Sequence, residues 1–249
     1  MENFFTHAAR RTLLALSFLS RLVNGRAATR DDIVGSFIWY PLAGAILGAV
    51  AVLPFALGLA EGKPLLQGIL YAAFMAWLTR ALHWDGWADL FDALGSGRTG
   101  EGFQEVLKDS RLGAFGAVGL VFGIGTMAVA AGLCLEQGHW PALLWGVILG
   151  RCLVAPLAGT TSAGSWSTLG VLTCEGTGTA SIVISTAAAI VSGLLCVGVW
   201  HTLAGLVLAG CGVLFLRRIA IREGGINGDF MGCAIIWGEL AVLLTVAVL

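Results

Sequence analysis

Residues 112–135 read LGAFGAVGLVFGIGTMAVAAGLCL, a stretch without a charged side chain. A helix of about 20 apolar residues is long enough to cross a lipid bilayer, so this stretch predicts a membrane span. The rest of the chain has the same character: 57% of its 249 residues are hydrophobic, 12% are charged, and the mean hydropathy is +0.88. A water-soluble core cannot use so much apolar sequence. The chain is therefore predicted to be an all-α, polytopic membrane helix bundle.

Six more apolar stretches flank this one, which gives about seven predicted transmembrane helices. In chain order the predicted spans are 36–60, 64–82, 112–135, 140–159, 180–199, 202–216 and 230–249. The fifth and sixth are so close together that one must be short or both must be shifted. From Asn3 to Asn24 polar residues recur with a helical period, which predicts an amphipathic helix on the membrane surface. We expect one integral-membrane domain over 1–249, with 1–30 as N-terminal helix and linker and 31–249 as the bundle.

Glycines recur four residues apart in three of the predicted spans, a spacing that lets membrane helices approach closely. These pairs are Gly44/Gly48, Gly119/Gly123 and Gly146/Gly150. The six cysteines are scattered singly, without the paired spacing of a zinc site or a disulfide framework. We therefore expect the glycines to pack helices together and the cysteines to act as small apolar residues.

Lysine and arginine are distributed unevenly, and this predicts an orientation. Membrane proteins keep most of these residues on the cytoplasmic side. With the N-terminus in the cytoplasm, all but two of the fourteen lie at or near that face, since Lys63 falls outside and Arg151 within a span. The connections 83–111, 160–179 and 217–229 then share the cytoplasmic side. No feature of the charge distribution indicates a nucleic-acid surface.

The densest group of polar residues is 83–92, which reads HWDGWADLFD. On a helix, Asp85, Asp89 and Asp92 lie at i, i+4 and i+7, so their carboxylates share one face. Like charges at this spacing repel, which predicts a cation between them. Carboxylate oxygens favour a hard ion, and a few of them completed by water and substrate phosphate suit Mg²⁺. The alternative is a solvated helix face that binds no metal.

Two further polar clusters each have a functional and a structural interpretation. The run 101–111 holds carboxylates at intervals of four, with Lys108, Ser110 and Arg111 beside them. That arrangement fits surface ion pairs as well as a phosphate clamp. Residues 222–229 read REGGINGD. Glycine lets backbone N–H groups approach an anion, but a plain turn between helices would use glycine too.

Together the three clusters predict a metal-assisted phosphoryl-transfer site, with aspartates for Mg²⁺, cations for phosphate oxygens and glycines for close approach. Arg151 lies in a predicted span, where charge is costly, and is either functional or paired with Glu239. His83 is a candidate base or phosphate contact, although beside Trp84 it also fits an interfacial anchor.

These motifs resemble, in content and order, the signature blocks of one family. The blocks are 83–92, 108–116 (KDSRLGAFG) and 224–229 (GGINGD), preceded by 18–21 (FLSR) and 36–44 (SFIWYPLAG). They are similar to those of the cobalamin synthases, the adenosylcobinamide-GDP ribazoletransferases, and the likeness runs nearly end to end. The chain departs from the family at Asn227, where threonine is usual, at Trp87, Leu90 and Ala93, and in lacking a proline-bearing stretch after Arg21.

The resemblance implies a reaction. In this family α-ribazole, or its 5′-phosphate, attacks the phosphate of adenosylcobinamide-GDP that is attached to cobinamide. The products are adenosylcobalamin, or its phosphate, and GMP. The resemblance further implies Mg²⁺ as cofactor and a multi-pass protein of the bacterial cytoplasmic (inner) membrane whose active site faces the cytoplasm. Its partners would be these small molecules and the lipid bilayer, and a homo-oligomer is compatible with the sequence.

The same resemblance assigns roles to the residues of the three clusters. Asp85, Asp89 and Asp92 are expected to bind the metal, and Asp109 and Asp229 to supply further ligands or the base, with His83 as a further catalytic candidate. The expected substrate-binding residues are Lys108, Ser110, Arg111, Arg222, Gly224, Gly225, Asn227 and Gly228.

Two other functions remain open at this point. A CDP-alcohol phosphotransferase uses similar chemistry, but here Asp85-Gly86-Trp87-Ala88 is followed by Asp89 in place of arginine, and a later aspartate pair four apart is missing. A secondary transporter would place polar groups near the bilayer midplane in broken helices, whereas most of these lie at the predicted cytoplasmic ends.

Overall fold

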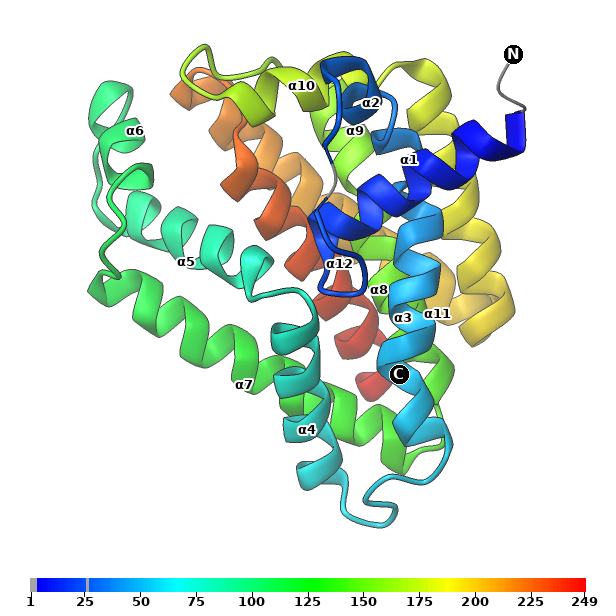
Figure 1. Cartoon of the computed structure of the whole chain (residues 1–249). Helices are drawn as coiled ribbons and strands as arrows, with labels where there is room; N and C mark the ends of the chain where they lie inside the picture. The colour runs from blue at the N-terminus through cyan, green and yellow to red at the C-terminus, as the bar shows by residue number, and fades with distance from the viewer. Residues whose placement is uncertain (1–3, 26) are drawn as a thin grey trace.

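The computed structural model describes residues 4–25 and 27–249, so the predictions that fall on Asn3 and Arg26 lie outside the described residues. This part of the chain is helical with short connections, which confirms the all-α class (Figure 1). Its elements are α1 (Phe4–Leu19), α2 (Arg30–Val34), η1 (Phe37–Trp39), α3 (Tyr40–Ala56), α4 (Pro64–Leu78), α5 (Leu82–Gly95), α6 (Glu101–Leu107), α7 (Ala114–Glu136), α8 (Trp140–Cys152), α9 (Val154–Gly159), α10 (Thr168–Gly176), α11 (Thr179–Glu223) and α12 (Gly228–Val248).

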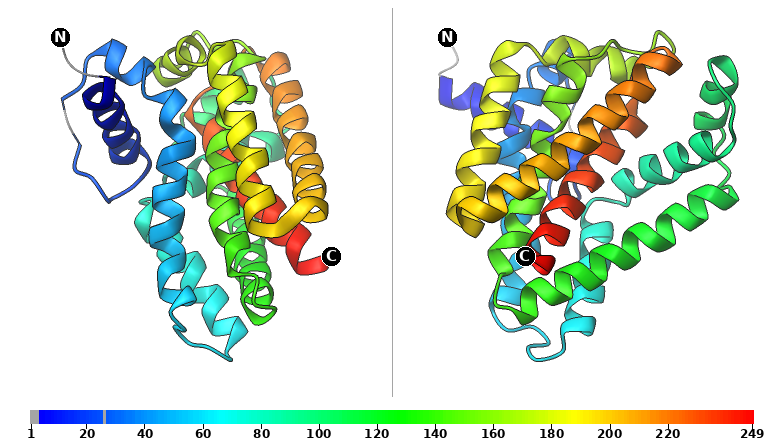
Figure 2. Two further views of the ribbon diagram at one scale, coloured as in Figure 1. Left: turned by 90° about the vertical axis from the view of Figure 1, so that its right-hand side faces the viewer. Right: turned by 180° about the vertical axis from the view of Figure 1, so that it is seen from behind.

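The multi-pass prediction is confirmed, but the count of seven spans is not. Among the described residues, five helices are long and apolar enough to cross a membrane, or six if the bent pair α4 and α5 counts as one. Gly198, at φ +77°, interrupts α11 near the junction expected between the fifth and sixth spans. Figure 2 shows the two parts of α11 side by side, and Gly193 in the first lies against Thr202 in the second. The label α11 therefore covers a helical hairpin.

Several predicted helix boundaries were wrong, because contacts between distant parts of the chain set them. The predicted 36–60 span corresponds to a candidate span over Arg30–Ala56, which begins earlier, with α2 and η1, and ends with α3 at Ala56. At the other end of the chain, α11 continues to Glu223, so the 217–229 connection shrinks to a short turn at 224–227. The N-terminal amphipathic helix exists as α1 but ends at Leu19. It lies across one end of α3 (Figure 1) and buries its apolar side against the bundle.

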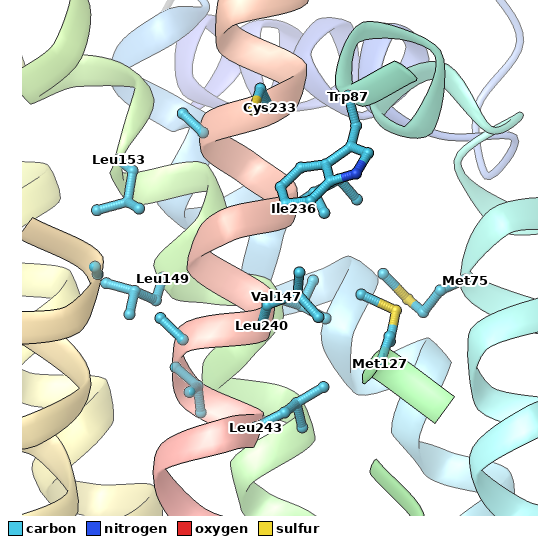
Figure 3. Close-up of a cluster of buried hydrophobic side chains, with 14 of the residues drawn as sticks. Met75, Trp87, Met127, Val147, Leu149, Leu153, Cys233, Ile236, Leu240 and Leu243 are labelled. Atoms are coloured by element: carbon cyan, nitrogen blue, oxygen red, sulfur yellow. The ribbon is translucent and has the colours of Figure 1, made fainter. Parts of the chain in front are cut away.

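α12 is the central helix of the bundle. It packs against α5, α7, α8 and α11, and its apolar side chains are buried along most of its length. Figure 3 shows Ile236, Leu240 and Leu243 of α12 among side chains from its neighbours. The predicted glycine pairs make the close contacts: Gly44 and Gly48 against α8, Gly119 and Gly123 against α5, and Gly146 and Gly150 against α12. The packing role of these glycines is confirmed.

Arg151 and Glu239 form an ion pair inside this core, which confirms the predicted pairing. Neither side chain has more than 2% of its surface exposed. Arg151 also donates through Nη1 to the carbonyl of Val147 at 3.2 Å, while its Nε and Nη2 have no hydrogen-bond partner among the described residues. The pair joins α8 to α12 below the polar groups at the end of the bundle.

A bend of 95° separates α4 from α5. The predicted 64–82 span therefore ends at Leu78, and α5 is not a continuation of it. At the bend, Arg80 and Ala81 have left-handed φ angles of 59° and 55°, which cost energy in residues other than glycine. Arg80 donates to the carbonyl groups of Ser17 and Phe18 at the end of α1, at 2.9 and 2.8 Å. Arg21 donates in return to α4, from Nε to the Trp77 carbonyl at 2.7 Å.

These reciprocal hydrogen bonds hold the bend against α1 and direct α5 across the bundle toward α12. The end of the bundle reached in this way carries α2, α6, α10 and the turn 224–227, and it is the upper end in Figure 1. We call it the polar end. The loop 57–63 lies at the opposite end, so most charged residues of the three sequence clusters share one end of the molecule.

Candidate active site

Three carboxylates from two helices meet where α5 crosses the beginning of α12. Gly86 lies directly against Asp229: an ideal Cβ built on Gly86 would be 2.7 Å from the Cα of Asp229 and 2.9 Å from its carbonyl oxygen. Asp85 and Asp89 flank this contact on α5, one exposed and the other half-buried. The structure thus brings Asp229 to the predicted aspartate face, although it lies 137 positions after Asp92 in the sequence.

The crowding of these groups affects their ionisation. The pKa of Asp89 is raised to about 7, mainly by burial and then by the neighbouring carboxylates of Asp229, Asp85 and Asp92. At neutral pH a large fraction of Asp89 would therefore hold a proton when no cation is present. A bound cation favours the charged form of a carboxyl group, so this cluster is electrostatically suited to one.

Asp92, the third predicted metal ligand, already has partners on both oxygens. It accepts hydrogen bonds from the backbone N–H groups of Gly113 and Gly116, each at 2.8 Å. These are among the first N–H groups of α7, which have no partner within the helix itself. Asp92 therefore holds the start of α7 against α5, and its free lone pairs are fewer than those of Asp85 and Asp89.

The donor set fits a hard divalent cation in its chemistry. No group of three His, Cys, Asp or Glu side chains in the described ranges surrounds a single point closely enough to hold a metal ion as the side chains stand. However, Mg²⁺ usually binds through one or two carboxylates, substrate phosphates and several waters rather than in a closed protein cage. Carboxylates that are close, partly exposed and not paired with lysine or arginine provide what such a site needs.

The turn before α12 is built to present Asp229. Asn227 accepts from the N–H groups of Asp229 and Phe230, at 3.1 and 3.3 Å, and so caps the helix. Its amide also donates to the Asp229 carboxylate at 2.5 Å, which fixes that side chain. Gly225, at φ +126°, packs against the backbone of 163–164, and a Cβ there would lie 2.3 Å from a backbone nitrogen. The glycine block is therefore more than a plain turn, because it both fixes Asp229 and joins a second loop.

That second loop, 160–167, was not predicted as part of the site. The N–H of Gly164 donates to the carbonyl of Ile226 at 3.0 Å, and the N–H of Ile226 donates to Ser162 at the same distance. Trp166 lies under the ammonium group of Lys108, 5.7 Å from the ring centroid. The serine, glycine and tryptophan of this loop carry no pattern that distinguishes them in sequence from an ordinary interhelical connection.

The 101–111 cluster divides into two parts. α6 ends at Leu107, so Asp109 does not continue the helical spacing of Glu101 and Glu105. Asp109 instead forms a bidentate pair with Arg111, with contacts from 2.6 to 3.2 Å. Hydrogen bonds from the Arg111 side chain and backbone lower the pKa of Asp109 to about 2. A carboxylate held so firmly in its charged form is a weak base, whereas Lys108 and the neighbouring exposed Ser110 stay available for an anion.

Arg222 and the glycines of the 224–229 block also lie at the polar end, but their surroundings differ. Arg222 donates to Glu223, whose side chain is buried. Glu223 also accepts from the N–H of Gly100 at 2.7 Å, and its carbonyl accepts from Gln104 at 3.1 Å. This buried glutamate ties the end of α11 to the loop before α6, a role that its position in the sequence did not reveal. Gly224 is exposed, and Gly228 begins α12 beside Asp229.

His83 is buried in the interface of α5 with α12, with 3% of its surface exposed. Burial, with a smaller contribution from the Arg151 guanidinium, holds the pKa of His83 well below its usual value, so the ring is neutral. Its Nε2 has no hydrogen-bond partner among the described residues. A buried polar nitrogen without a partner costs about 1–3 kcal/mol, and a side chain buried between two helices does not act as the interfacial anchor that the sequence also allowed.

Gly86 was also missed as a site residue, and its contact leads to a prediction. In a helix, changing glycine to alanine usually stabilises by about 0.5–1 kcal/mol, but the Cβ of Gly86→Ala must push α5 away from Asp229. A misplacement of about 1 Å can lower a rate about a hundredfold. We expect Gly86→Ala to lower turnover by about that factor in a transfer assay. The matched control is Gly125→Ala on α7, where a Cβ meets nothing within 4 Å, and equal rates for the two variants would contradict the close contact.

Comparison with known proteins gives consistent matches. Residues 11–247 match the family described as cobalamin-5-phosphate synthase. A protein named adenosylcobinamide-GDP ribazoletransferase from Nitratidesulfovibrio vulgaris strain DP4 is 46% identical over 98% of each chain. The protein of that name from strain Miyazaki F is 43% identical over 94% of each, and one from Bradyrhizobium diazoefficiens is 32% identical over 94% of this chain and 92% of its own. No solved structure matches the chain.

Proposed function

The chain belongs to the cobalamin-5-phosphate synthase family, whose members carry out the final assembly of cobalamin, and from that premise we propose its substrates and its catalytic centre. We propose that it joins adenosylcobinamide-GDP to α-ribazole, or to α-ribazole 5′-phosphate, and releases GMP. The observation that carries the assignment of the centre is the contact of Asp229 with Gly86, between Asp85 and Asp89. Two sequence clusters that are remote along the chain form one carboxylate centre there.

In the proposed reaction, the ribazole hydroxyl attacks the phosphorus atom attached to cobinamide. A new P–O bond forms, the P–O bond to the GMP portion breaks, and GMP leaves with the bonding electron pair. The hydroxyl proton must pass to a base. Mg²⁺ usually binds through only one or two carboxylates, so the member of Asp85, Asp89 and Asp229 that is not a metal ligand would take this proton.

The remaining residues bind and orient. Two of the three carboxylates of Asp85, Asp89 and Asp229 would hold Mg²⁺, which when bound supplies charge neutralisation for a pyrophosphate. Asp92 fixes α5 against α7 through Gly113 and Gly116. Lys108 and Arg111 offer cations for phosphate oxygens. Arg222 uses one of the five N–H groups of its guanidinium for Glu223, so the others are available to phosphate oxygens as well.

The proposed location is the bacterial cytoplasmic membrane, with the polar end in the cytoplasm. Basic residues support this orientation, because they are concentrated at the polar end. They include Arg30 in α2, Arg98, Lys108 and Arg111 on either side of α6, and Arg217, Arg218 and Arg222 in the last turns of α11, while Arg10 pairs with Asp32 of α2. Arg21 and Arg80 lie at the contact between α1 and the bend from α4 to α5. Lys63 lies in the loop at the opposite end.

Labelling of single cysteines tests the orientation. In a background without the six native cysteines, Ser96→Cys should be protected from an impermeant maleimide in intact cells and become reactive after lysis. Gly62→Cys, exposed at the opposite end, should react in intact cells. The reverse pattern would place the polar end outside and exclude the proposed cytoplasmic substrates.

Release of GMP tests the reaction. Purified protein in lipid nanodiscs, given adenosylcobinamide-GDP, α-ribazole and Mg²⁺, should form GMP and adenosylcobalamin in equal amounts. Chelation by EDTA should stop the reaction, and added Mg²⁺ should restore it. A CDP-activated alcohol offered with the same acceptor should yield no CMP. Release of CMP without release of GMP would refute the proposed donor and favour a CDP-alcohol phosphotransferase.

A further inference from the structure

A small cavity lies beside the carboxylate centre, on the side of α5 that faces α1. Its volume is about 210 Å³, and its walls come from α1, α3, α5, α10 and α12. Asp85 and Asp229 form one wall. Most of the others are apolar and include Phe18, Leu19, Leu169, Met231 and Ile235. The cavity is therefore a largely apolar chamber with two carboxylates at one side.

The size of the chamber limits what it can hold. A cavity of about 150 Å³ is sufficient for benzene, and pockets for drug-sized ligands occupy about 300–1,000 Å³. At about 210 Å³ the chamber accommodates one flat ring system. It is too small for a corrinoid or for a complete nucleoside diphosphate.

The polarity of the chamber further limits which ring systems could bind in it. Apart from the carboxylates, the buried side chains with polar atoms that line the cavity are Tyr40 and His83. A base with several exocyclic donors and acceptors would leave most of them unpaired here, and each unpaired group costs about 1–3 kcal/mol. A weakly polar aromatic base with one ring-nitrogen acceptor would lose little.

We infer that this chamber is the subsite for the base of the acceptor nucleoside. The inference rests on the proposed function and adds the location and the chemistry of the acceptor site. A nucleoside bound there would extend its sugar hydroxyl toward Asp85 and Asp229, which form the wall of the chamber. The donor pyrophosphate would lie beyond them, toward Lys108 and the loops at the other end of α5. The phosphorus atom would then lie between the attacking hydroxyl and the leaving GMP, as an in-line displacement requires, with the carboxylates beside it.

Changing the chamber volume at Leu169 tests the subsite. Leu169 belongs to α10, outside the carboxylate centre, and its side chain lines the chamber. Leu169→Trp should narrow the chamber and raise the KM for α-ribazole at least about tenfold, since a mismatch of one methylene in an apolar pocket is already worth about 10–200-fold. The KM for adenosylcobinamide-GDP should stay within about twofold. Leu169→Ala should widen the chamber and favour an acceptor with a larger base, such as a naphthimidazole riboside, by about tenfold relative to wild type.

A matched control changes a different cavity. Cys211→Phe fills an apolar pocket of about 710 Å³ on the other side of α5, between α5 and α11, and should leave the acceptor KM unchanged. Equilibrium binding of α-ribazole alone, followed by calorimetry without the donor, should weaken in Leu169→Trp and not in Cys211→Phe.

The possible outcomes distinguish failure of the proposed subsite from failure of the proposed reaction. If wild-type protein releases no GMP, the proposed function fails. If it releases GMP but both Leu169 variants keep wild-type acceptor KM and binding, or change the donor KM instead, the subsite is refuted while the reaction stands. Should Leu169→Trp fail to fold, the base preference of Leu169→Ala decides alone.

Discussion

Asparagine in place of Asp89 should leave the protein folded in the membrane and lower the rate of GMP release by about two to three orders of magnitude. The substitution keeps the size of the side chain but removes the charge and the basic oxygen. Groups that stabilise charge in a transition state are worth about 2.7–4 kcal/mol each when removed, and metal ligands contribute on a similar scale. The measurement is single-turnover GMP release at saturating substrates and Mg²⁺.

The same assay on a double variant tests whether the cluster acts as one unit. Asp229→Asn should lower the rate about as much as Asp89→Asn, and the two together should be little slower than either, because residues that serve one function are strongly non-additive. The control is Glu105→Gln, an exposed partner of Arg98 at 3.6 Å, since a surface ion pair is worth only about 0–1 kcal/mol. Losses that multiply, or a nearly active Asp229→Asn, would mean that α5 and α12 do not share one centre.

Loss of Arg151 should destabilise the bundle more than any surface change. Arg151→Met leaves Glu239 without its partner in the core, and removing one partner of a buried ion pair costs about 3–5 kcal/mol. We expect a large fall in the thermal unfolding temperature of the protein in detergent, with loss of folded protein from membranes. Glu239→Leu should have a similar effect, because it leaves the guanidinium unpaired.

The double variant Arg151→Met with Glu239→Leu is the control for this interpretation. An apolar pair of similar volume is often as stable as a buried ion pair, so the double variant should recover most of the stability lost in each single one. If it is as unstable as the singles, the cost arises from packing and not from unpaired charge.

Much of this architecture could be predicted from the sequence because it follows from local patterns. Apolar length predicted the helices, and glycine spacing predicted the close contacts of Gly44 with α8 and Gly150 with α12. The cost of an isolated charge in a membrane led to the pairing of Arg151 with Glu239. The spacing of Asp85 and Asp89 placed both on one face of a helix, and this face is where Asp229 arrives.

The features that could not be predicted depend on contacts between remote segments. Arg80 and Ala81 adopt left-handed φ angles without any glycine to suggest them, because hydrogen bonds between Arg80 and α1 hold the bend. The engagement of Asp92 by the start of α7 and of Ile226 by the 160–167 loop likewise arises from the fold. Helical spacing alone could not distinguish an aspartate that positions a helix from one that serves the reaction.

Mapping a bound metal by cleavage of the backbone tests the central claim most directly. Fe²⁺ bound in place of Mg²⁺ generates radicals in the presence of ascorbate and peroxide, which cut the chain next to the ion. The wild-type protein should be cut both at 85–89 and at 228–229, excess Mg²⁺ should suppress both cuts, and the double variant Asp89→Asn with Asp229→Asn should show neither. Cuts confined to 101–111, or cuts at 85–89 that persist in the double variant, would contradict a metal centre shared by α5 and α12.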